Sequence, residues 1–165
     1  MSKFSRRQVL QGAAATGAAL STPLVLNAAA HGYTNDPTKS GKLVFGFNVP
    51  QTGPYSEEGK DELRAYELAV EHINGEGDGG MLNTMTVNGE GPALKGNGVL
   101  GMKLNYVTGD TQTKSDAARA SARKMIENEG VIMFSGGSSS GVAIAVQGLA
   151  QEKKVVFMCG LTHSN

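Results

Sequence analysis

The chain has 165 residues, and its fifteen basic residues are balanced by fifteen acidic ones. A balanced charge gives no sign of the net positive charge that is typical of nucleic-acid-binding proteins, so we expect no nucleic-acid partner. The one cysteine, Cys159, cannot form an internal disulfide, and with only three histidines in the chain it belongs to no set of metal ligands. We therefore expect neither a metal site nor a cofactor.

The first thirty residues have the pattern of an export signal. A basic start over residues 3–7 precedes an apolar, alanine-rich run over residues 9–26, and three alanines at 28–30 offer a cleavage site. The stretch Ser5–Leu10 resembles the twin-arginine export signal. We predict a signal peptide over residues 1–30 and a periplasmic mature protein. No later stretch approaches the roughly 20 apolar residues that span a membrane.

The mature chain begins with a polar, turn-rich lead over residues 31–41. The apolar run Leu43–Phe47 then predicts a buried strand. Between residues 57 and 74 the apolar positions recur at spacings of three and four, which predicts an amphipathic helix with Ser56 as its N-cap and Gly75 as its terminator.

A glycine-rich insertion over residues 75–101 follows this helix. The tetrapeptide Asn-Gly-Glu-Gly occurs at residues 74–77 and again at 88–91, and both copies are favourable turn sequences. Residues 81–87 could form a short ribbon between the two turns. The acidic residues lack the spacing of a calcium loop, so a surface hairpin is favoured over a cation site.

Three more strands and two more helices are predicted in the rest of the chain. The strands are expected over residues 102–107, 131–134 and 155–158, and the helices after Ser115 and after a turn at residues 135–141, with Gly109–Thr111 ending the first of these strands. Strands alternating with helices predict an α/β fold, a three-layer parallel sheet flanked by helices and joined by right-handed crossovers.

Ligands of such sheets bind beyond the carboxyl ends of the strands, where loops lead into helices. The richest of these loops contains Ser138, Ser139 and Ser140 between glycines. Serine hydroxyls and the N–H groups of a helix start suit a carboxylate or an amide oxygen. The same residues are equally consistent with a well-capped turn that binds nothing.

The sequence gives little support to a catalytic role for this loop. Gly137–Gly141 fits the G-x-S-x-G nucleophile elbow with Ser139 as nucleophile, but only His163 follows it, and the one acid between them is Glu152. Neither a dinucleotide-binding fingerprint nor a phosphate-binding loop is present. We therefore predict no catalytic residues, and a serine hydrolase is kept only as a lesser alternative.

The chain resembles the type I periplasmic binding proteins that serve importers of branched-chain amino acids, amides and urea. Four stretches carry the resemblance: Pro50–Pro54, Ala69–Asn74, Gly109–Gln112, and the serine run with the helix, strand and Cys159–Asn165 that follow it. The resemblance implies that residues 42–165 form part of an N-terminal lobe. Cys159 and Gly160 depart from the family, because many members have Ser-Pro there.

In that family, hydroxyl and N–H groups after the third and fourth strands hold the ligand's carboxylate or its equivalent. Family members are much longer and close two lobes around the ligand, so we expect this chain to be an N-terminal fragment whose second lobe is absent. The resemblance implies a monomeric solute-binding component of an ABC importer, which delivers its solute to an inner-membrane permease and ATPase; the alternative is a ligand-sensing domain of a receptor or regulator. Matched by motif, the implied ligand-binding residues are Ser138, Ser139, Ser140, Leu161, Thr162 and His163.

Overall fold

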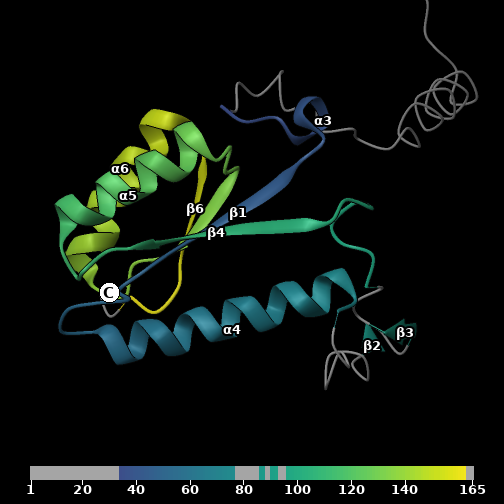
Figure 1. The fold of residues 1–165 in the computed structure, drawn as a ribbon, viewed down its shortest axis with the longest axis horizontal. Helices are drawn as coiled ribbons and strands as arrows, with labels where there is room; N and C mark the ends of the chain where they lie inside the picture. Colours follow the sequence, from purple (N-terminus) through teal and green to yellow (C-terminus); the bar gives the residue numbers. More distant parts are fainter. Residues whose placement is uncertain (1–33, 77–85, 88–89, 93–95, 163–165) are drawn as a thin grey trace, which may run out of the picture. The chain divides into compact units, whose positions relative to one another are not determined.

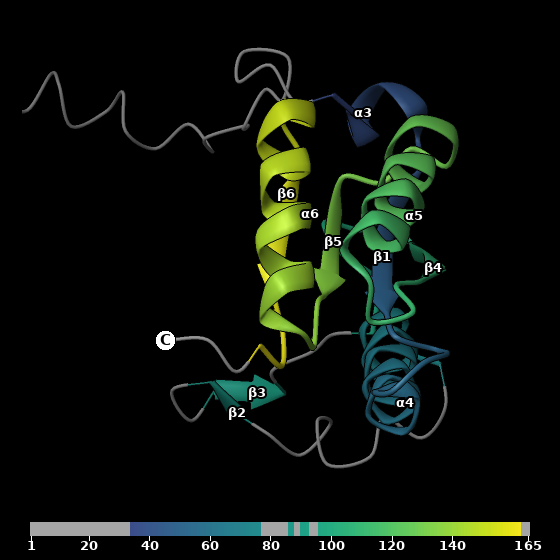
Figure 2. The same cartoon turned by 90° about the vertical axis from the view of Figure 1, so that its left-hand side faces the viewer.

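Four parallel strands form the central sheet of the computed structural model (Figure 1). Their order is β4-β1-β5-β6, which Figure 2 shows from right to left. The structure describes residues 34–76, 86–87, 90–92 and 96–162. The predicted signal peptide and His163 lie outside the described residues. The strands are β1 (Leu43–Val49), β4 (Leu104–Asp110), β5 (Met133–Gly136) and β6 (Val156–Cys159).

Helices cover both faces of this sheet. One face is covered by α4 (Ser56–Asn74), which packs on β1 and β4. The other is covered by α5 (Ser115–Asn128) and α6 (Ser140–Lys153), which lie side by side (Figure 2). Four strands therefore alternate with three helices, and the predicted three-layer α/β fold is confirmed.

The larger part of the core lies under α5 and α6. Val44 and Phe134 point from the sheet into this layer, and Phe134 is fully buried. Helix α5 faces this core with one apolar side, whose four buried residues are Ala118, Ala122, Met125 and Ile126. Each large apolar side chain removed from water contributes about 1.5–3 kcal/mol.

A smaller core lies between the sheet and α4. Successive side chains of a strand point to opposite faces, so Leu43 and Phe47 of β1 face α4 while Val44 faces α5. The ring of Phe47 stacks on that of Tyr66 with centroids 4.5 Å apart. Because β1 is buried on both faces, its first part, Leu43–Phe47, is a continuously apolar run, as predicted.

Two strands run further than predicted. β1 continues through Asn48, whose side-chain amide donates to the Ala118 carbonyl at 3.0 Å. β4 continues to Asp110, so Gly109 does not end the strand as predicted. A Cβ at Gly109 would lie 1.9 Å from Ser121 Oγ, which shows that the glycine allows α5 to pack closely on β4.

The other boundaries shift by one or two residues. β5 begins at Met133 and extends to Gly136, so the turn before α6 is shorter than predicted. Helix α4 begins at Ser56 itself, with Tyr55 at the cap position, and Gly75 ends it in the left-handed conformation as predicted. Helix α5 likewise begins at Ser115, after Lys114.

The lead segment contains α3 (Pro37–Ser40), one helical turn capped by the Asp36 side chain. The side chain of Asn35 donates to the backbone carbonyls of Ile126 and Val131. These two bonds anchor the lead segment to the last turn of α5 and to the residues that connect α5 with β5.

The glycine-rich insertion contains an antiparallel pair, β2 (Thr86–Val87) and β3 (Glu90–Pro92). The predicted hairpin is therefore present, with β2 before the second Asn-Gly-Glu-Gly copy at residues 88–91 and β3 beginning at Glu90 within that copy. Residues 77–85 are outside the described part, and so is most of the predicted ribbon. Among the helices that the structure describes, none is long and apolar enough to cross a membrane.

Candidate functional site

The carboxyl ends of the four strands meet at one edge of the sheet. Parallel pairing places Asn48 of β1 opposite Gly109 of β4 and Gly136 of β5, and Gly136 opposite Cys159 of β6. Gly136 has φ +128°, and a Cβ there would lie 2.1 Å from the Asn48 carbonyl oxygen, so only glycine fits. The strand order reverses between β1 and β5, and parallel α/β sheets bind ligands beside such a reversal.

The serine loop, Gly137–Ser140, leads from β5 into α6. Ser139 occupies the cap position, and its side chain makes no capping hydrogen bond. Its carbonyl accepts the first helical bond, from the Ala143 N–H at 2.9 Å. Since the first N–H groups of a helix have no partner within it, the loop presents backbone donors beside two half-exposed hydroxyls, those of Ser139 and Ser140.

Ser138 is oriented differently from the two serines that follow it. Only 1% of this residue is exposed, and its hydroxyl donates to Glu62 Oε2 of α4 at 2.9 Å. The predicted ligand-binding serines therefore divide into an inward one and two at the surface.

Glu62 is the centre of a buried polar cluster that sequence reasoning missed. It is 6% exposed, and its Oε1 accepts from the Tyr66 hydroxyl at 2.7 Å. The Tyr66 hydroxyl oxygen also lies 2.7 Å from Ser135 Oγ, which lies 2.9 Å from the Met158 carbonyl of β6, so the single Ser135 proton is donated to one or the other of these two oxygens. Within the described residues, Glu62 has no salt-bridge partner.

The tyrosine of this cluster stays neutral at ordinary pH. Burial raises the pKa of Tyr66 far above its usual value, and Glu62 raises that pKa further, although the hydrogen bond with Ser135 opposes the rise. Tyr66 is therefore a permanent hydroxyl donor to Glu62. A Cβ at Gly160 would lie 2.6 Å from the Tyr66 hydroxyl oxygen, so the chain after β6 passes directly over the cluster.

The loop after β6 reaches the serine loop. The Thr162 hydroxyl donates to the Gly137 carbonyl at 2.8 Å and also contacts the Cys159 sulfur. Leu161 is 48% exposed, and its backbone role stays a prediction. The structure thus brings Thr162 to the loop that carries Ser139 and Ser140, while His163 lies outside the described residues.

A hollow of about 580 Å³ lies between α6 and β6, beside the serine loop rather than within it. Ala143 and Ile144 line it from α6, and Phe157 and Cys159 line it from β6, with Thr162 at its margin. Its lining is mixed, because Gln147 and Gln151 of α6 contribute amide groups beside these apolar side chains and the Thr162 hydroxyl adds a further polar group.

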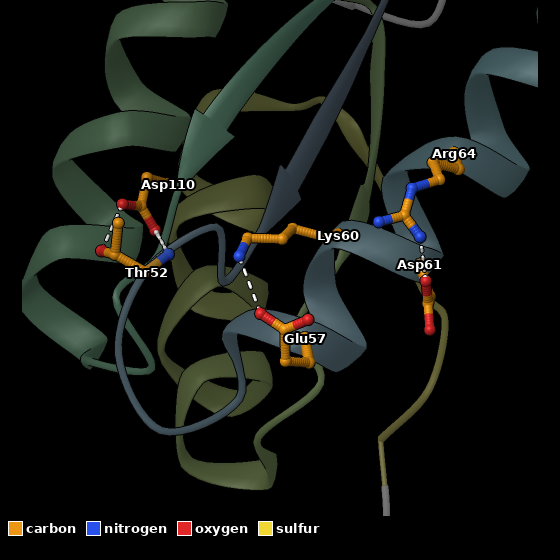
Figure 3. Close-up of polar contacts among 6 residues, drawn as sticks. All are labelled: Thr52, Glu57, Lys60, Asp61, Arg64 and Asp110. Atoms are coloured by element: carbon orange, nitrogen blue, oxygen red, sulfur yellow. Dashed lines mark hydrogen bonds and ion pairs between the residues drawn. The ribbon is translucent and has the colours of Figure 1, made fainter.

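Asp110, the last residue of β4, holds the loop after β1 in place through hydrogen bonds. Its Oδ1 accepts from the N–H groups of Gln51, Thr52 and Gln112 at 2.9–3.2 Å, and its Oδ2 accepts from the Thr52 hydroxyl at 2.6 Å. Figure 3 shows the contacts between Asp110 and Thr52. Partial burial opposes ionisation, but these hydrogen bonds together hold the pKa of Asp110 below its usual value. Gln112 and Thr113 follow in left-handed conformations, which are strained for residues other than glycine.

The outer face of α4 near this loop carries the ion pairs Glu57–Lys60 and Asp61–Arg64 (Figure 3). All four side chains are largely exposed, and pairs of this kind contribute about 0–1 kcal/mol each. This face is a solvated helix surface.

The geometry does not support the hydrolase alternative. The serine of a nucleophile elbow lies in a strained conformation, whereas Ser139 has φ −92° and ψ 131°, an ordinary extended backbone. The described residues also contain no cluster of three or more potential metal ligands among histidine, cysteine, aspartate and glutamate.

Two family models match the sequence of this chain, one over the α/β fold and one over the predicted signal peptide. Residues 42–165 match the family model "Periplasmic binding protein", and residues 3–23 match the signal sequence of the twin-arginine translocation pathway. No curated protein matches the chain.

Several solved structures share the fold. One is the branched-chain amino acid transporter substrate-binding protein LivJ from Streptococcus pneumoniae in complex with isoleucine, 18% identical with a TM-score of 0.61 over 75% of this chain and 30% of that one. A solute-binding protein of an ABC transporter from Rhodopseudomonas palustris, in complex with 3,4-dihydroxybenzoic acid, is 22% identical with a TM-score of 0.56 over 73% and 27%. A type 1 periplasmic binding protein from Bordetella pertussis is 28% identical with a TM-score of 0.51 over 71% and 26%.

This chain therefore spans less than a third of the length of these three relatives. The signal match confirms the predicted export to the periplasm. The matching family consists of binding proteins rather than enzymes, and its model covers the whole predicted lobe, so the chain belongs to the periplasmic binding protein family.

Proposed function

We propose that this chain forms part of a solute-binding protein of an ABC importer, and that it captures a small solute through a carboxylate or an equivalent amide oxygen. The observation that carries the proposal is the start of α6. There the free N–H groups and the hydroxyls of Ser139 and Ser140 lie at the carboxyl edge of the sheet, joined to Thr162 by its bond to Gly137. A helix start favours an electron-rich group, because its N–H donors and its dipole both point toward the ligand.

Each predicted residue has a distinct role in this proposal. Ser139 and Ser140 donate to the solute oxygen, and the Leu161 backbone, Thr162 and His163 complete the site after β6. Ser138 does not contact the solute in this proposal, because its hydroxyl already donates to Glu62. An apolar part of the solute would extend toward the hollow lined by Phe157 and Cys159.

The ligands bound in the structural relatives support a carboxylate-bearing solute. Isoleucine and 3,4-dihydroxybenzoic acid differ in their apolar parts, but each has one carboxylate group. The same holds for 4-hydroxybenzoate, which is bound in another solute-binding protein of an ABC transporter from Rhodopseudomonas palustris. Branched-chain amino acids and small aromatic acids are therefore the first solutes to test, followed by short amides and urea.

The remaining steps concern the whole protein. We infer a monomer that closes a second lobe over the solute and delivers it to an inner-membrane permease driven by an ATPase. The twin-arginine signal supports this role over that of a cytoplasmic regulator, which would not be exported.

Thermal-shift measurements on the exported protein test the proposal, because a solute that binds only the native state raises the melting temperature. The panel contains isoleucine, leucine, 4-hydroxybenzoate, acetamide and urea. We expect one class to stabilise the wild type and to stabilise the Ser139→Ala variant much less. Ser40→Ala is the matched control, since Ser40 bonds only near α3. A folded protein that responds to no member of the panel would refute the proposed solute classes.

A further inference from the structure

The first residues of the serine loop have no side chains that could fix its conformation. Gly136 and Gly137 both have positive φ, at +128° and +86°, and neither has a side chain that could anchor the chain. Ser138 is the first side chain after them, and it is almost fully buried. Apart from the bond that the Gly137 carbonyl accepts from Thr162, the position of the loop therefore depends on what holds Ser138.

Glu62 of α4 holds it. The Ser138 hydroxyl donates to Glu62 Oε2 at 2.9 Å, and the other carboxyl oxygen, Oε1, accepts from Tyr66. A buried polar atom that loses its partner is costly, because water does not replace the lost bond. Both oxygens of Glu62 thus keep their hydroxyl partners in place.

The same cluster extends to the other half of the predicted site. From Tyr66 it continues through Ser135 to the Met158 carbonyl of β6, and Gly160 lies against Tyr66 and Glu62. One carboxyl group on α4 is therefore connected to the loop after β5 and to the strand that leads into residues 161–163.

We propose that Glu62 is a positioning residue for solute binding: by holding Ser138 it sets where Ser139, Ser140 and the first N–H groups of α6 lie. The link to binding rests on the proposed function, whereas the link to loop position does not. Glu62 itself does not touch the solute in this proposal, because its carboxyl oxygens are buried behind Ser138 and Tyr66.

Amide hydrogen exchange of the solute-free exported protein tests the positioning directly. We expect Glu62→Ala and Ser138→Ala to speed exchange in peptides covering residues 137–146 by about tenfold, with α5 peptides unchanged. Glu62→Gln keeps an oxygen acceptor for Ser138 and should restore most of the protection. Tyr66→Phe leaves the bond to Ser138 intact and should leave residues 137–146 near wild type.

Glu71→Gln is the matched control, since Glu71 lies on the same helix with an exposed side chain. Unchanged exchange over residues 137–146 in both alanine variants would overturn the proposal. Equal acceleration in α5 would overturn it too, because that result indicates a general loss of stability.

Affinity provides the second readout, with isoleucine and 4-hydroxybenzoate as the probes. Whichever probe stabilises the wild type should bind Glu62→Ala about tenfold more weakly, with Glu62→Gln close to wild type. Unchanged affinity in Glu62→Ala would overturn the binding role. If neither probe stabilises the wild type, the proposed solute classes fail, while the exchange measurement still decides the positioning.

Discussion

Replacing Asp110 with alanine tests how the loop after β1 is held. The substitution removes four hydrogen bonds at once, three from backbone N–H groups and one from the Thr52 hydroxyl. A net contribution of about 0.5–1.5 kcal/mol per bond gives an upper range of about 2–6 kcal/mol. Because these loops are partly exposed and water replaces some bonds, we expect a loss of about 2 kcal/mol.

Asparagine at the same position provides an internal comparison. Its one side-chain oxygen can still accept from the N–H groups of Gln51, Thr52 and Gln112, so Asp110→Asn should lose about half as much stability as Asp110→Ala. The assay is urea unfolding of the exported protein at neutral pH, with Thr52→Ala as a variant that removes only the hydroxyl bond. Stability of Asp110→Ala within about 0.5 kcal/mol of wild type would refute the reasoning.

The pH dependence of this effect has a defined sign. The folded pKa of Asp110 is lowered, so its ionised form stabilises the protein above the unfolded pKa of about 4. That contribution is lost as the pH falls through the folded pKa. The stability difference between wild type and Asp110→Asn should therefore shrink below about pH 4, and a difference that grows there would contradict the assignment.

Three further substitutions test the packing. Gly136→Ala should melt at a much lower temperature or fail to accumulate, because its Cβ would lie 2.1 Å from the Asn48 carbonyl oxygen. Thr113→Gly should unfold at a higher urea concentration, by about 1 kcal/mol in free energy, since it relieves a left-handed conformation; lower stability would contradict that strain. Leu104→Ala should cost about 2–5 kcal/mol in urea unfolding, whereas Leu100→Ala, at a residue 93% exposed, should change little, and similar losses would refute the proposed core.

Hydrophobic patterning predicted the sheet and its helices but misplaced their ends. Asn48 and Gly109 had the chemistry of strand breakers, yet both are paired within the sheet, because Asn48 bonds to Ala118 and Gly109 makes room for Ser121. Contacts between segments that are distant in the sequence decide where a strand ends, and a local pattern of residues carries no information about those contacts.

The arrangement of the candidate site could be predicted from the sequence only in part, and the binding role of its residues stays a prediction. Parallel topology alone placed the serine loop and Thr162 at one edge of the sheet. Glu62 was missed because a charged residue on an amphipathic helix is normally assigned to its solvated face. Its spacing was the available signal, since Glu62 precedes Tyr66 by four residues and Val70 by eight, and so lies on the buried face.

The binding site itself is tested most directly by a crystal structure of the exported protein with the solute that stabilises it. We expect the carboxylate or amide oxygen of that solute to lie at the start of α6, within hydrogen-bonding distance of Ser139, Ser140 and Thr162, with Ser138 still bound to Glu62. A solute bound away from this edge of the sheet, or held without any contact to the serine loop, would contradict the proposed site.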